Sequence, residues 1–301
     1  MEVKHCRLHQ VKRPRSDLWS LPQTADNVHY VKLRKELGRA HPILRPLPLP
    51  YDRPMNVDGK VALITGGSNG IGEGVARHVA GKGAQVVLAD IDDQRGAALA
   101  EELGGRYVHT DVSRAADSQA AVDFAVREFG ALHIAHLNAG VTTTCSMGDD
   151  FDPEAYRQAM SINLDGVVYG IAAARPAIIA SGGGTIVATA SMAGLVAVPF
   201  DPIYAANKHA VVGLVRSLGD LYASEGIRIH ALCPSFAYTN IIKGSEQSLL
   251  DMGFPILDVS DVVDAVQHIL DAETTGECWF VIAGRESEPF RFRHAPGPRL
   301  D

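Results

Sequence analysis

The residues whose types and spacing first indicate chemistry are the glycines of the run Thr65-Gly-Gly-Ser-Asn-Gly-Ile-Gly72. Glycines in such a run let the backbone turn tightly and approach a pyrophosphate. The N-terminus of a following helix then offers free N–H groups to the negative charge. A glycine-rich loop alone is a weak signal, but this one follows an apolar run and precedes a helical pattern. We therefore expect a dinucleotide to be held by Gly66, Ser68, Asn69, Gly70, Ile71 and Gly72.

An acidic residue ends the second apolar run. Asp90 stands 18 residues after Gly72, and a carboxylate there can accept hydrogen bonds from the adenosine ribose and repel a 2′-phosphate. No Lys or Arg stands at residues 67–69, and Ile91 follows Asp90, so no cation is placed to receive an extra phosphate. The predicted cofactor is therefore NAD rather than NADP. The alternative is that Asp90 only caps the next helix.

Short apolar runs alternate with longer amphipathic runs from Val57 onward. This alternation is typical of β-α units that build a parallel sheet covered by helices. The predicted fold class is α/β, a three-layer doubly wound Rossmann fold with a seven-stranded parallel sheet, in one domain over residues 55–301. The expected strands are residues 61–65, 85–89, 106–109, 134–137, 185–189, 227–232 and 278–282. The expected helices are residues 118–129, a long one after Asp152-Pro153, residues 204–222 and residues 261–270, with Asp152 and Ser260 as N-caps.

Four further motifs follow in order along the chain. They are Asn138-Ala-Gly140 after the fourth predicted strand, Asn163-Leu-Asp-Gly166 on the long helix, Ser191 after the fifth strand, and Tyr204-Ala-Ala-Asn-Lys208, which begins 13 residues later. In these motifs and in the glycine turn, the chain resembles the short-chain dehydrogenase/reductase family over about residues 57–284. The resemblance implies an oxidoreductase that moves hydride between NAD and an alcohol or ketone carbon.

The resemblance also implies roles for individual residues. The implied catalytic set is Asn163, Ser191, Tyr204 and Lys208, with no metal. The implied cofactor contacts, beyond the turn and Asp90, are Asp111 and Val112 beside the adenine, Asn138, Ala139 and Gly140 along the cofactor, Tyr204 and Lys208 themselves, and Pro234, Ser235 and Thr239 in the nicotinamide loop.

The chemistry explains why these residue types are needed. A free phenol has a pKa of about 10, so Tyr204 is a poor acid–base catalyst at neutral pH unless its phenolate is stabilised. Lys208 lies one helical turn further on the same face, where its charge can lower that pKa and hold the nicotinamide ribose. Ser191 would position the substrate oxygen, and Asn163 would hold a water that carries the proton away. Taken singly, each residue also has an ordinary interpretation as a cap, a local hydrogen bond or packing.

Three positions depart from the resembled pattern. Leu137 stands where the family usually has a second Asn, and Ser235 where it has Gly, which concerns the fit of the cofactor and not the reaction. Residues 191–214 and 256–276 resemble the 15-hydroxyprostaglandin dehydrogenase branch, but Asp201 replaces its Gln. The apolar residues 193–200 fit either a substrate wall or a packed loop. The expected substrate is a fairly apolar alcohol or ketone.

Composition limits the other functions. The chain has a net charge of −7, with 11 Lys and Arg against 5 Asp and Glu in residues 1–54 and 17 against 30 in the rest. An acidic body argues against nucleic-acid binding, which needs basic surface. The four cysteines (Cys6, Cys145, Cys233 and Cys278) are far apart and suggest a reducing compartment. With no apolar run of membrane-spanning length and no signal-peptide pattern, we expect a cytoplasmic protein without membrane contact.

Residues 1–54 are basic and rich in proline, without a sustained period. They are interpreted either as a disordered extension, including a start codon placed too far upstream, or as a partner-binding or targeting arm. The expected assembly is a homodimer or homotetramer built by the body of the chain. Two alternatives to the enzyme remain, a catalytically silent NAD-binding module and a partner-binding protein that uses the arm.

Overall fold

The computed structural model describes residues 55–143 and 147–293 of the chain. The predictions for residues 1–54, Cys6 and Cys145 lie outside these described residues. The helices and strands named below all fall within the two ranges.

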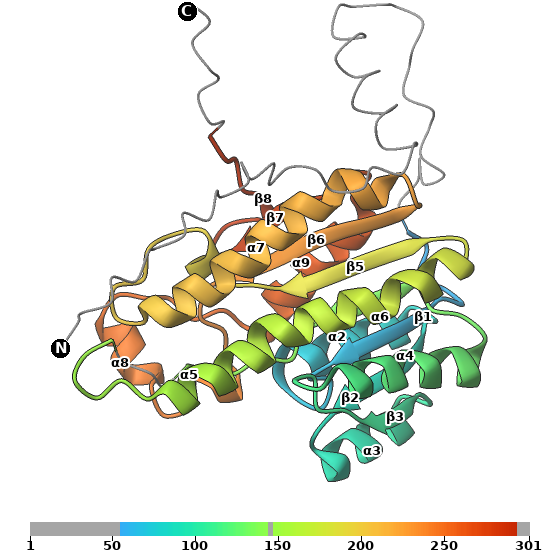
Figure 1. Ribbon diagram of the computed structural model, residues 1–301, viewed down its shortest axis with the longest axis horizontal. Coiled ribbons are helices and arrows are strands. Elements are labelled where there is room, and N and C mark those ends of the chain that lie inside the picture. Colours follow the sequence, from blue (N-terminus) through green and yellow to red (C-terminus); the bar gives the residue numbers. More distant parts are fainter. Residues whose placement is uncertain (1–54, 144–146, 294–301) are drawn as a thin grey trace, which may run out of the picture. The chain divides into compact units, whose positions relative to one another are not determined.

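One twisted sheet runs through the described part of the chain (Figure 1), with the strand order β3-β2-β1-β4-β5-β6-β7-β8. The first seven strands in this order are parallel, and all seven predicted strands are present within two residues of their expected ends. The strands are β1 (Val61–Thr65), β2 (Gln85–Asp90), β3 (Arg106–His109), β4 (Ile134–Leu137), β5 (Gly184–Thr189), β6 (Ile227–Pro234), β7 (Cys278–Val281) and β8 (Glu288–Pro289).

The eighth strand corrects the predicted count of seven. β8 has two residues and pairs antiparallel with β7, through Phe280 with Glu288 and Trp279 with Pro289. Two residues are too few to show a period of two. Proline is tolerated there because an edge strand needs no donor on its outer side. The strand exists because β7 offers a free edge, which the local sequence of β8 does not reveal.

Helices cover both faces of the sheet. On one face α4, α6 and α7 bury Ala121, Ile171 and Val211 against the strands, and on the other α2 and α9 bury Val75 and Val262. The helical segments are α2 (Gly70–Gly81), α3 (Asp93–Glu102), α4 (Ala115–Phe129), α5 (Pro153–Met160), η1 (Ser161–Asp165), α6 (Gly166–Ala180), η2 (Met192–Gly194), α7 (Pro202–Ala223), η3 (Asn240–Ile242), α8 (Glu246–Asp251) and α9 (Val259–Asp271).

The predicted caps are half right. Asp152 accepts hydrogen bonds from the amides of Glu154 and Ala155 and begins α5, as expected. Ser260 is not a cap, because α9 begins two residues earlier at Asp258, which forms a reciprocal capping box with Asp261. A pair of carboxylates that satisfies two backbone donors begins the helix before the serine hydroxyl is needed.

Leu137 belongs to the core. It is buried, and a Cβ added to Gly170 of α6 would lie 2.5 Å from Leu137 Cδ2. The side chain therefore fills the space between β4 and α6. At this position an apolar contact has replaced the polar one that the family pattern suggests.

The helical stretch from α5 to α6 is long and apolar enough to cross a membrane by length and composition, although the sequence predicts no such segment. Pro153–Ala180 spans 28 residues, and an 18-residue window in it has a mean hydropathy of 1.2. In the structure, Ile171 and Ile178 of this stretch pack in the core beneath it. Burial against the sheet accounts for the apolar side chains that face the core, while 44% of the window is buried in all.

Candidate active site

Asn163 lies on a wide turn inside the long helix. The segment η1 (Ser161–Asp165) is a π-helix between α5 and α6, where the sequence predicts one regular helix. Asn163 is fully buried, its Oδ1 accepts from the Val141 amide (2.8 Å), and its Nδ2 donates to the Val141 carbonyl (2.9 Å). Single π-turns are rare in proteins overall, and those that occur are often found at functional sites. This one holds Asn163 against the segment that follows β4.

Gly140 lies between the polar ends of two implied catalytic residues. A Cβ added to it would stand 3.1 Å from Asn163 Oδ1 and 3.7 Å from Lys208 Nζ. Lys208 is only 3% exposed, and its Nζ donates to the Thr189 carbonyl at 3.0 Å. Burial lowers the pKa of Lys208 to about 8. The structure thus brings Asn163 and Lys208 together around a residue that has no side chain.

Tyr204 differs from its sequence expectation in one respect. Burial raises the pKa of its phenol to about 12, a hydrogen bond with Ser191 opposes the rise, and the Asp201 carboxylate adds to it. Lys208 Nζ lies 5.6 Å from the centroid of the Tyr204 ring. The net shift is therefore upward, whereas the sequence predicted that Lys208 would lower this pKa. Desolvation of the phenolate outweighs the opposing hydrogen bond with Ser191.

Ser191 has its predicted ordinary role as a cap and also contacts the proposed catalytic phenol. As the N-cap of η2 its Oγ accepts from the Ala193 amide (3.1 Å), which is the ordinary interpretation. The same hydroxyl lies 3.4 Å from the Pro234 carbonyl and is hydrogen-bonded to Tyr204. Ser191 therefore connects the end of β5 with the end of β6 and with the phenol.

The glycine turn is shaped by close backbone approaches. Gly66 has φ +61°, and a Cβ on it would lie 2.8 Å from the Ala139 Cα. A Cβ on Gly72 would lie 2.1 Å from the Gly66 oxygen, so α2 packs directly on the turn. Gly70 faces Thr239, whose Cγ2 would be 3.1 Å from an added Cβ. The turn, the segment after β4 and the loop after β6 therefore converge, as the sequence predicted.

Asp90 lies at the end of β2 and binds the turn. Its carboxylate accepts from the Ser68 amide (2.9 Å) and the Asp92 amide (3.1 Å). The alternative that Asp90 caps the next helix is wrong, because α3 is capped by Asp92, which accepts from the Arg95 amide at 3.0 Å. Asp90 is thus held beside the glycine turn, and Asp92 is the residue that caps α3.

The remaining predicted contacts lie at the same edge of the sheet. Asp111 accepts from the amide (3.0 Å) and hydroxyl (2.7 Å) of Ser113, and Val112 packs on Gly166, where an added Cβ would be 2.9 Å from Val112 Cγ2. Ser235 follows β6, and its amide donates to the Val281 carbonyl at 2.8 Å. The Ser235 backbone thus continues the ladder between β6 and β7.

The residues at this edge fit a dinucleotide. The Ser68 hydroxyl is buried without a hydrogen-bond partner among the described residues, so a polar group is left for a ligand. The glycines let the backbone of the turn pack closely against the segments after β4 and β6, where a Cβ would clash. In an open α/β sheet this is the edge at which ligands bind, beside the point where the strand order reverses between β1 and β4.

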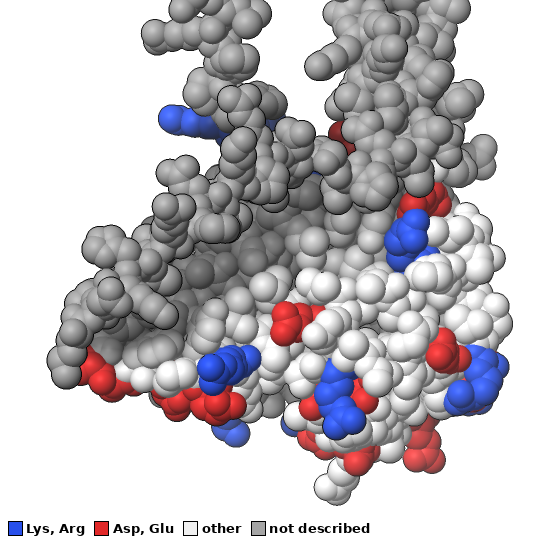
Figure 2. Space-filling model, viewed as in Figure 1, with Lys and Arg blue, Asp and Glu red and all other residues white. Residues whose placement is uncertain are grey.

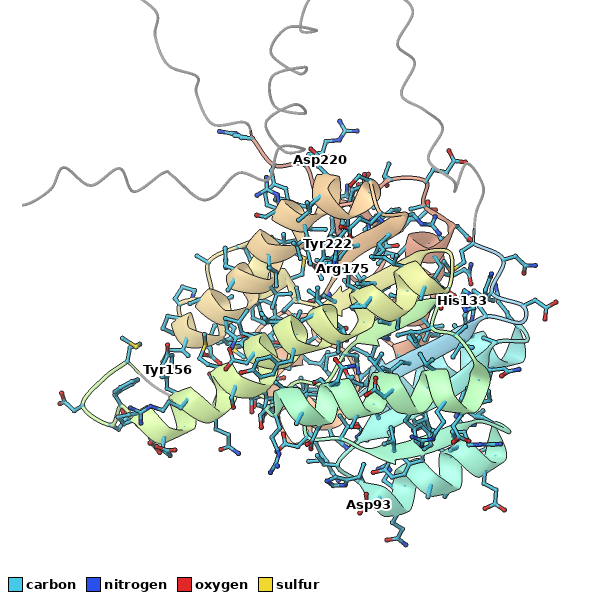
Figure 3. The ribbon with its side chains drawn as sticks, turned by 45° about the vertical axis from the view of Figure 1, so that its right-hand side comes forward. Asp93, His133, Tyr156, Arg175, Asp220 and Tyr222 are labelled. Atoms are coloured by element: carbon cyan, nitrogen blue, oxygen red, sulfur yellow. The ribbon has the colours of Figure 1, made fainter. Side chains whose placement is uncertain are left out.

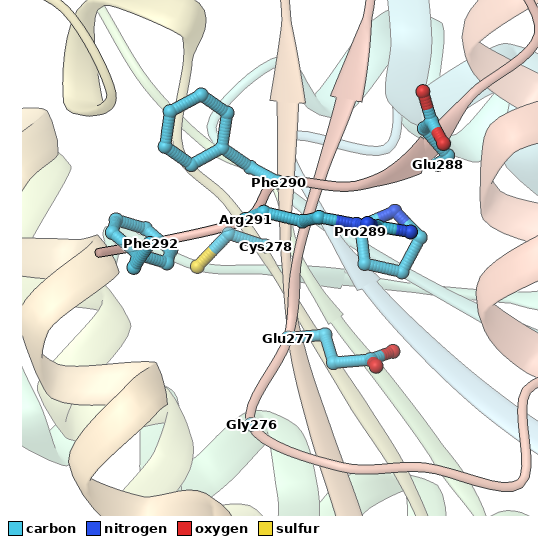
Figure 4. A pocket seen from close by; sticks show the side chains of 8 residues that line it. All are labelled: Gly276, Glu277, Cys278, Glu288, Pro289, Phe290, Arg291 and Phe292. Carbon is cyan, nitrogen blue, oxygen red and sulfur yellow. The ribbon is translucent and has the colours of Figure 1, made fainter. Parts of the chain in front are cut away.

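A separate pocket in the described part of the chain lies away from the proposed catalytic residues. It has a volume of about 440 Å³ and lies at the beginning of β7 and along β8 (Figure 4). Because Gly276 and Glu277 precede β7, the pocket opens at the opposite end of that strand from the catalytic residues. The residues that line it are Gly276, Glu277, Cys278, Glu288, Pro289, Phe290, Arg291 and Phe292.

Comparison with known proteins identifies the family. A model of the family described as short chain dehydrogenase matches residues 60–249, so the chain belongs to this family of oxidoreductases. Cyclohexanol dehydrogenase of Acinetobacter sp. (strain SE19) is 38% identical over 204 residues, 66% of this chain and 81% of that protein. The short-chain dehydrogenase reductase ATA1 of Arabidopsis thaliana is 34% identical over 242 residues, 78% of this chain and 89% of that protein.

Two further similarities agree with this assignment. The 3beta-hydroxysteroid dehydrogenase 2 of Eggerthella lenta is 37% identical over 195 residues, 63% of this chain and 75% of that protein. The crystal structure of gox2181 superposes with a TM-score of 0.71 at 28% identity, covering 75% of this chain and 95% of that chain. The similarity in structure confirms the predicted α/β Rossmann-like fold.

Proposed function

We propose that this protein is an NAD-dependent dehydrogenase that moves hydride between NAD(H) and a secondary alcohol or ketone. The observation that carries the proposal is the arrangement of four side chains at one edge of the sheet. Asn163 and Lys208 meet around Gly140, and Tyr204 is hydrogen-bonded to Ser191. Acid–base groups and a positioning hydroxyl are thereby gathered beside the nucleotide cradle.

The residues of the chain have distinct roles in this reaction. The turn and Asp90 would hold the nucleotide, whose nicotinamide supplies the hydride chemistry when bound. With a pKa of about 12, Tyr204 carries its proton at neutral pH and can donate it from Oη to a ketone oxygen that Ser191 orients. Lys208 keeps an ammonium below about pH 8. Asn163 holds the Val141 backbone beside it.

The preference for NAD is argued from charge. The Asp90 carboxylate is fixed at the end of β2 by the Ser68 amide, which places a negative charge where a 2′-phosphate would lie. The nearby Arg95 is turned toward Glu73, 3.6 Å away, and its amide binds Asp92. Arg95, the first cation after Asp90 in the sequence, is therefore already paired with a carboxylate, which favours NAD over NADP.

The proposed substrate is a largely apolar, cyclic secondary alcohol or the matching ketone. The stretch 193–200 is packed at its start, where Ala193 is buried, but Val196 is 45% and Phe200 67% exposed. After β6, exposed Tyr238 and Ile241 lie in the chain between Phe236 and Phe254, whose rings pack edge to face with centroids 5.4 Å apart. Apolar side chains at the mouth of a site favour apolar ligands. Relatives named for cyclohexanol, borneol and a hydroxysteroid support a ring-shaped substrate.

Absorbance of reduced nicotinamide tests the proposal directly. Purified full-length protein is mixed with NAD or NADP and a panel of cyclic, linear and charged secondary alcohols. We expect turnover with NAD and a cyclic apolar alcohol, and little with charged alcohols. Binding of NAD without turnover of any alcohol would favour the catalytically silent module. Tighter binding of NADP than of NAD would refute the cofactor assignment.

We also propose a homodimer or homotetramer, in the cytoplasm, that pairs the long helices. The part of the α6 face that is open to view in Figure 2 is mainly uncharged, and Val168, Ile179 and Leu221 are exposed on α6 and α7. Apolar residues at such positions favour a partner helix. The resemblance to the 15-hydroxyprostaglandin dehydrogenase branch stays a prediction, since the relatives named above carry other names.

Light scattering measures whether residues 55–301 form this oligomer without residues 1–54. A protein that starts at Met55 is compared with the full chain. We expect the same oligomer from both, since residues 1–54 are expected to contribute no contact to it. A monomer or an aggregate from the shorter protein beside an intact oligomer of the full chain would show that residues 1–54 are structural.

A further inference from the structure

Three polar side chains form a continuous line from the interior of the sheet to the glycine turn. His136 Nε2 lies 3.0 Å from Thr189 Oγ1, and Thr189 Oγ1 lies 3.2 Å from Asn138 Oδ1. The Asn138 amide then donates from Nδ2 to the carbonyls of Thr65 (3.2 Å) and Gly66 (3.3 Å). His136, in the middle of β4, is thus linked to the backbone of the proposed phosphate-binding turn.

The chemistry of the groups fixes the direction of every hydrogen bond in this line. Because Asn138 Nδ2 faces two carbonyls, its Oδ1 must be the atom that faces Thr189 and must accept. The Thr189 hydroxyl has one proton and gives it to Asn138, so toward His136 it can only accept. His136 is therefore the Nε2–H tautomer and is the donor at the start of the line.

His136 is placed unfavourably for stability. It is fully buried between Ile64 and Val187 of the neighbouring strands, and burial lowers the pKa of its imidazole to about 3, so the ring stays neutral. Its Nδ1 has no hydrogen-bond partner among the described residues. A buried acceptor without a partner costs stability. An apolar side chain would be more stable at this position, which suggests that the imidazole serves the site instead.

We propose that His136 is a positioning residue for the nicotinamide cofactor, a role that rests on the proposed function. Its Nε2–H orients the Thr189 hydroxyl, Thr189 orients the Asn138 amide, and Asn138 fixes two carbonyls of the glycine turn. The carbonyl of Thr189 also accepts from Lys208 Nζ at 3.0 Å. One threonine therefore couples the cofactor cradle to the catalytic lysine, and His136 sets the orientation of that threonine.

The test separates positioning from packing by measuring two quantities in the full-length protein. The dissociation constant of NAD is measured by calorimetry, and the unfolding temperature is measured without cofactor. His136→Leu removes both the donor and the orphaned Nδ1. It should weaken NAD binding by about threefold to tenfold, the range for one lost hydrogen bond, while the unfolding temperature stays or rises. His136→Gln offers an N–H near the position of Nε2 and should restore the affinity to within about twofold.

Matched variants exclude indirect effects. Thr185→Val removes another buried hydroxyl of β5, one without a partner among the described residues, and should leave NAD binding unchanged. In a Thr189→Val background, His136→Leu should have no further effect on NAD binding, because the line is already broken. An additive effect there would overturn the proposal.

The outcome also distinguishes this proposal from the proposed function. If the natural protein binds neither NAD nor NADP, the proposed function fails, and the role of His136 fails with it. If the natural protein binds NAD and His136→Leu unfolds at lower temperature with unchanged affinity, only the role of His136 is refuted. The imidazole would then be an ordinary core residue.

Discussion

The buried hydroxyl of Thr143 donates to the carboxylate of Asp201, 2.7 Å from Oδ1 and 2.8 Å from Oδ2. The same carboxylate accepts from the Tyr204 amide at 2.9 Å and begins α7. The segment after β4 is thereby tied to the first turn of the helix that carries the proposed catalytic phenol. Asp201 stands where the 15-hydroxyprostaglandin dehydrogenase branch has Gln, and its charge raises the pKa of Tyr204.

Asp201→Asn should move the pH profile of alcohol oxidation to lower pH. Asn can still accept from the Tyr204 amide and from Thr143, but it carries no charge that disfavours the phenolate, so the pKa of Tyr204 falls. We expect the alkaline rise of kcat/KM to shift down by a few tenths of a unit to about one unit. Asp220→Asn, at the other end of α7 (Figure 3), is the control and should not shift it. A shift to higher pH would contradict the assignment.

Tyr204→Phe should lower kcat by about a hundredfold to ten-thousandfold, because only the ionisable hydroxyl is lost. NAD should still bind, since the packing of the ring is kept. The matched control is Tyr222→Phe on the same helix, whose ring lies beside the Arg175 guanidinium (5.7 Å; Figure 3). Stopped-flow measurement of NADH formation gives both rates. Turnover of Tyr204→Phe within a few-fold of the natural protein would remove the phenol from the mechanism.

Lys208 should make the cofactor-free protein more stable as the pH rises above about 8. The pKa of its ammonium is near 8 in the folded chain and 10.5 for a fully hydrated lysine side chain. Between these values the unfolded chain binds more protons, and stability therefore increases with pH. We expect about 1 kcal/mol between pH 8 and pH 9 from denaturant unfolding, and no such gain in Lys208→Met. The pH range ends below 10 because the raised pKa of Tyr204 acts in the opposite direction above it. Equal slopes in both proteins would show that Lys208 is not desolvated.

Asp90→Ala should narrow the preference for NAD over NADP, because the repulsion of a 2′-phosphate is removed. NADP should bind more tightly and NAD more weakly, which two calorimetric titrations measure. Asp92→Ala is the control. It removes the cap of α3 and should cost about 0.5–2 kcal/mol of stability while the ratio of the two affinities stays constant. An unchanged ratio in Asp90→Ala would place the discrimination elsewhere.

Gly170→Ala should destabilise the fold by about 1–3 kcal/mol, because the new Cβ would lie 2.5 Å from Leu137. Leu137→Ala in the same chain opens that space, so the double variant should lose less than the two single changes together. Gly213→Ala on α7 is the control, since nothing lies within 4 Å of its added Cβ. That change should be neutral or stabilising by up to about 1 kcal/mol. Additive losses in the double variant would mean that the two residues do not touch.

Periodic features of this chain could be predicted from the sequence. The buried strands are continuous apolar runs, and the glycine turn is fixed by local backbone geometry, so both are determined by nearby residues. Contacts between residues far apart in the sequence could not be predicted from it. Nothing near Asn163 indicates a π-turn, and β8 depends on the edge of β7. The pairing of His136 with Thr189 joins residues 53 apart.

The electrostatics of the site were the least predictable part. The spacing of Tyr204 and Lys208 correctly indicates that they share a helix face, with 5.6 Å between Nζ and the ring centroid. The direction of the pKa shift depends on how much water each group loses, which is a property of the whole fold. The sequence therefore indicated that the two groups are neighbours and missed the cost of burying the phenol, which raises its pKa.

The order of the strands divides the chain into a first part that is proposed to bind the nucleotide and a second part that is proposed to contact the substrate. Everything proposed to hold the nucleotide phosphates and adenosine lies within residues 55–140, whereas the loops with Phe200, Tyr238 and Ile241, which are proposed to face the substrate, follow β5 and β6. The two parts meet along β1, β4 and β5, where β4 is hydrogen-bonded on both sides. A chimera that joins residues 55–140 of this protein to the second part of a relative should keep its nucleotide preference and acquire the relative's substrates. Substrate range can thus diverge in this fold by recombination at a single junction.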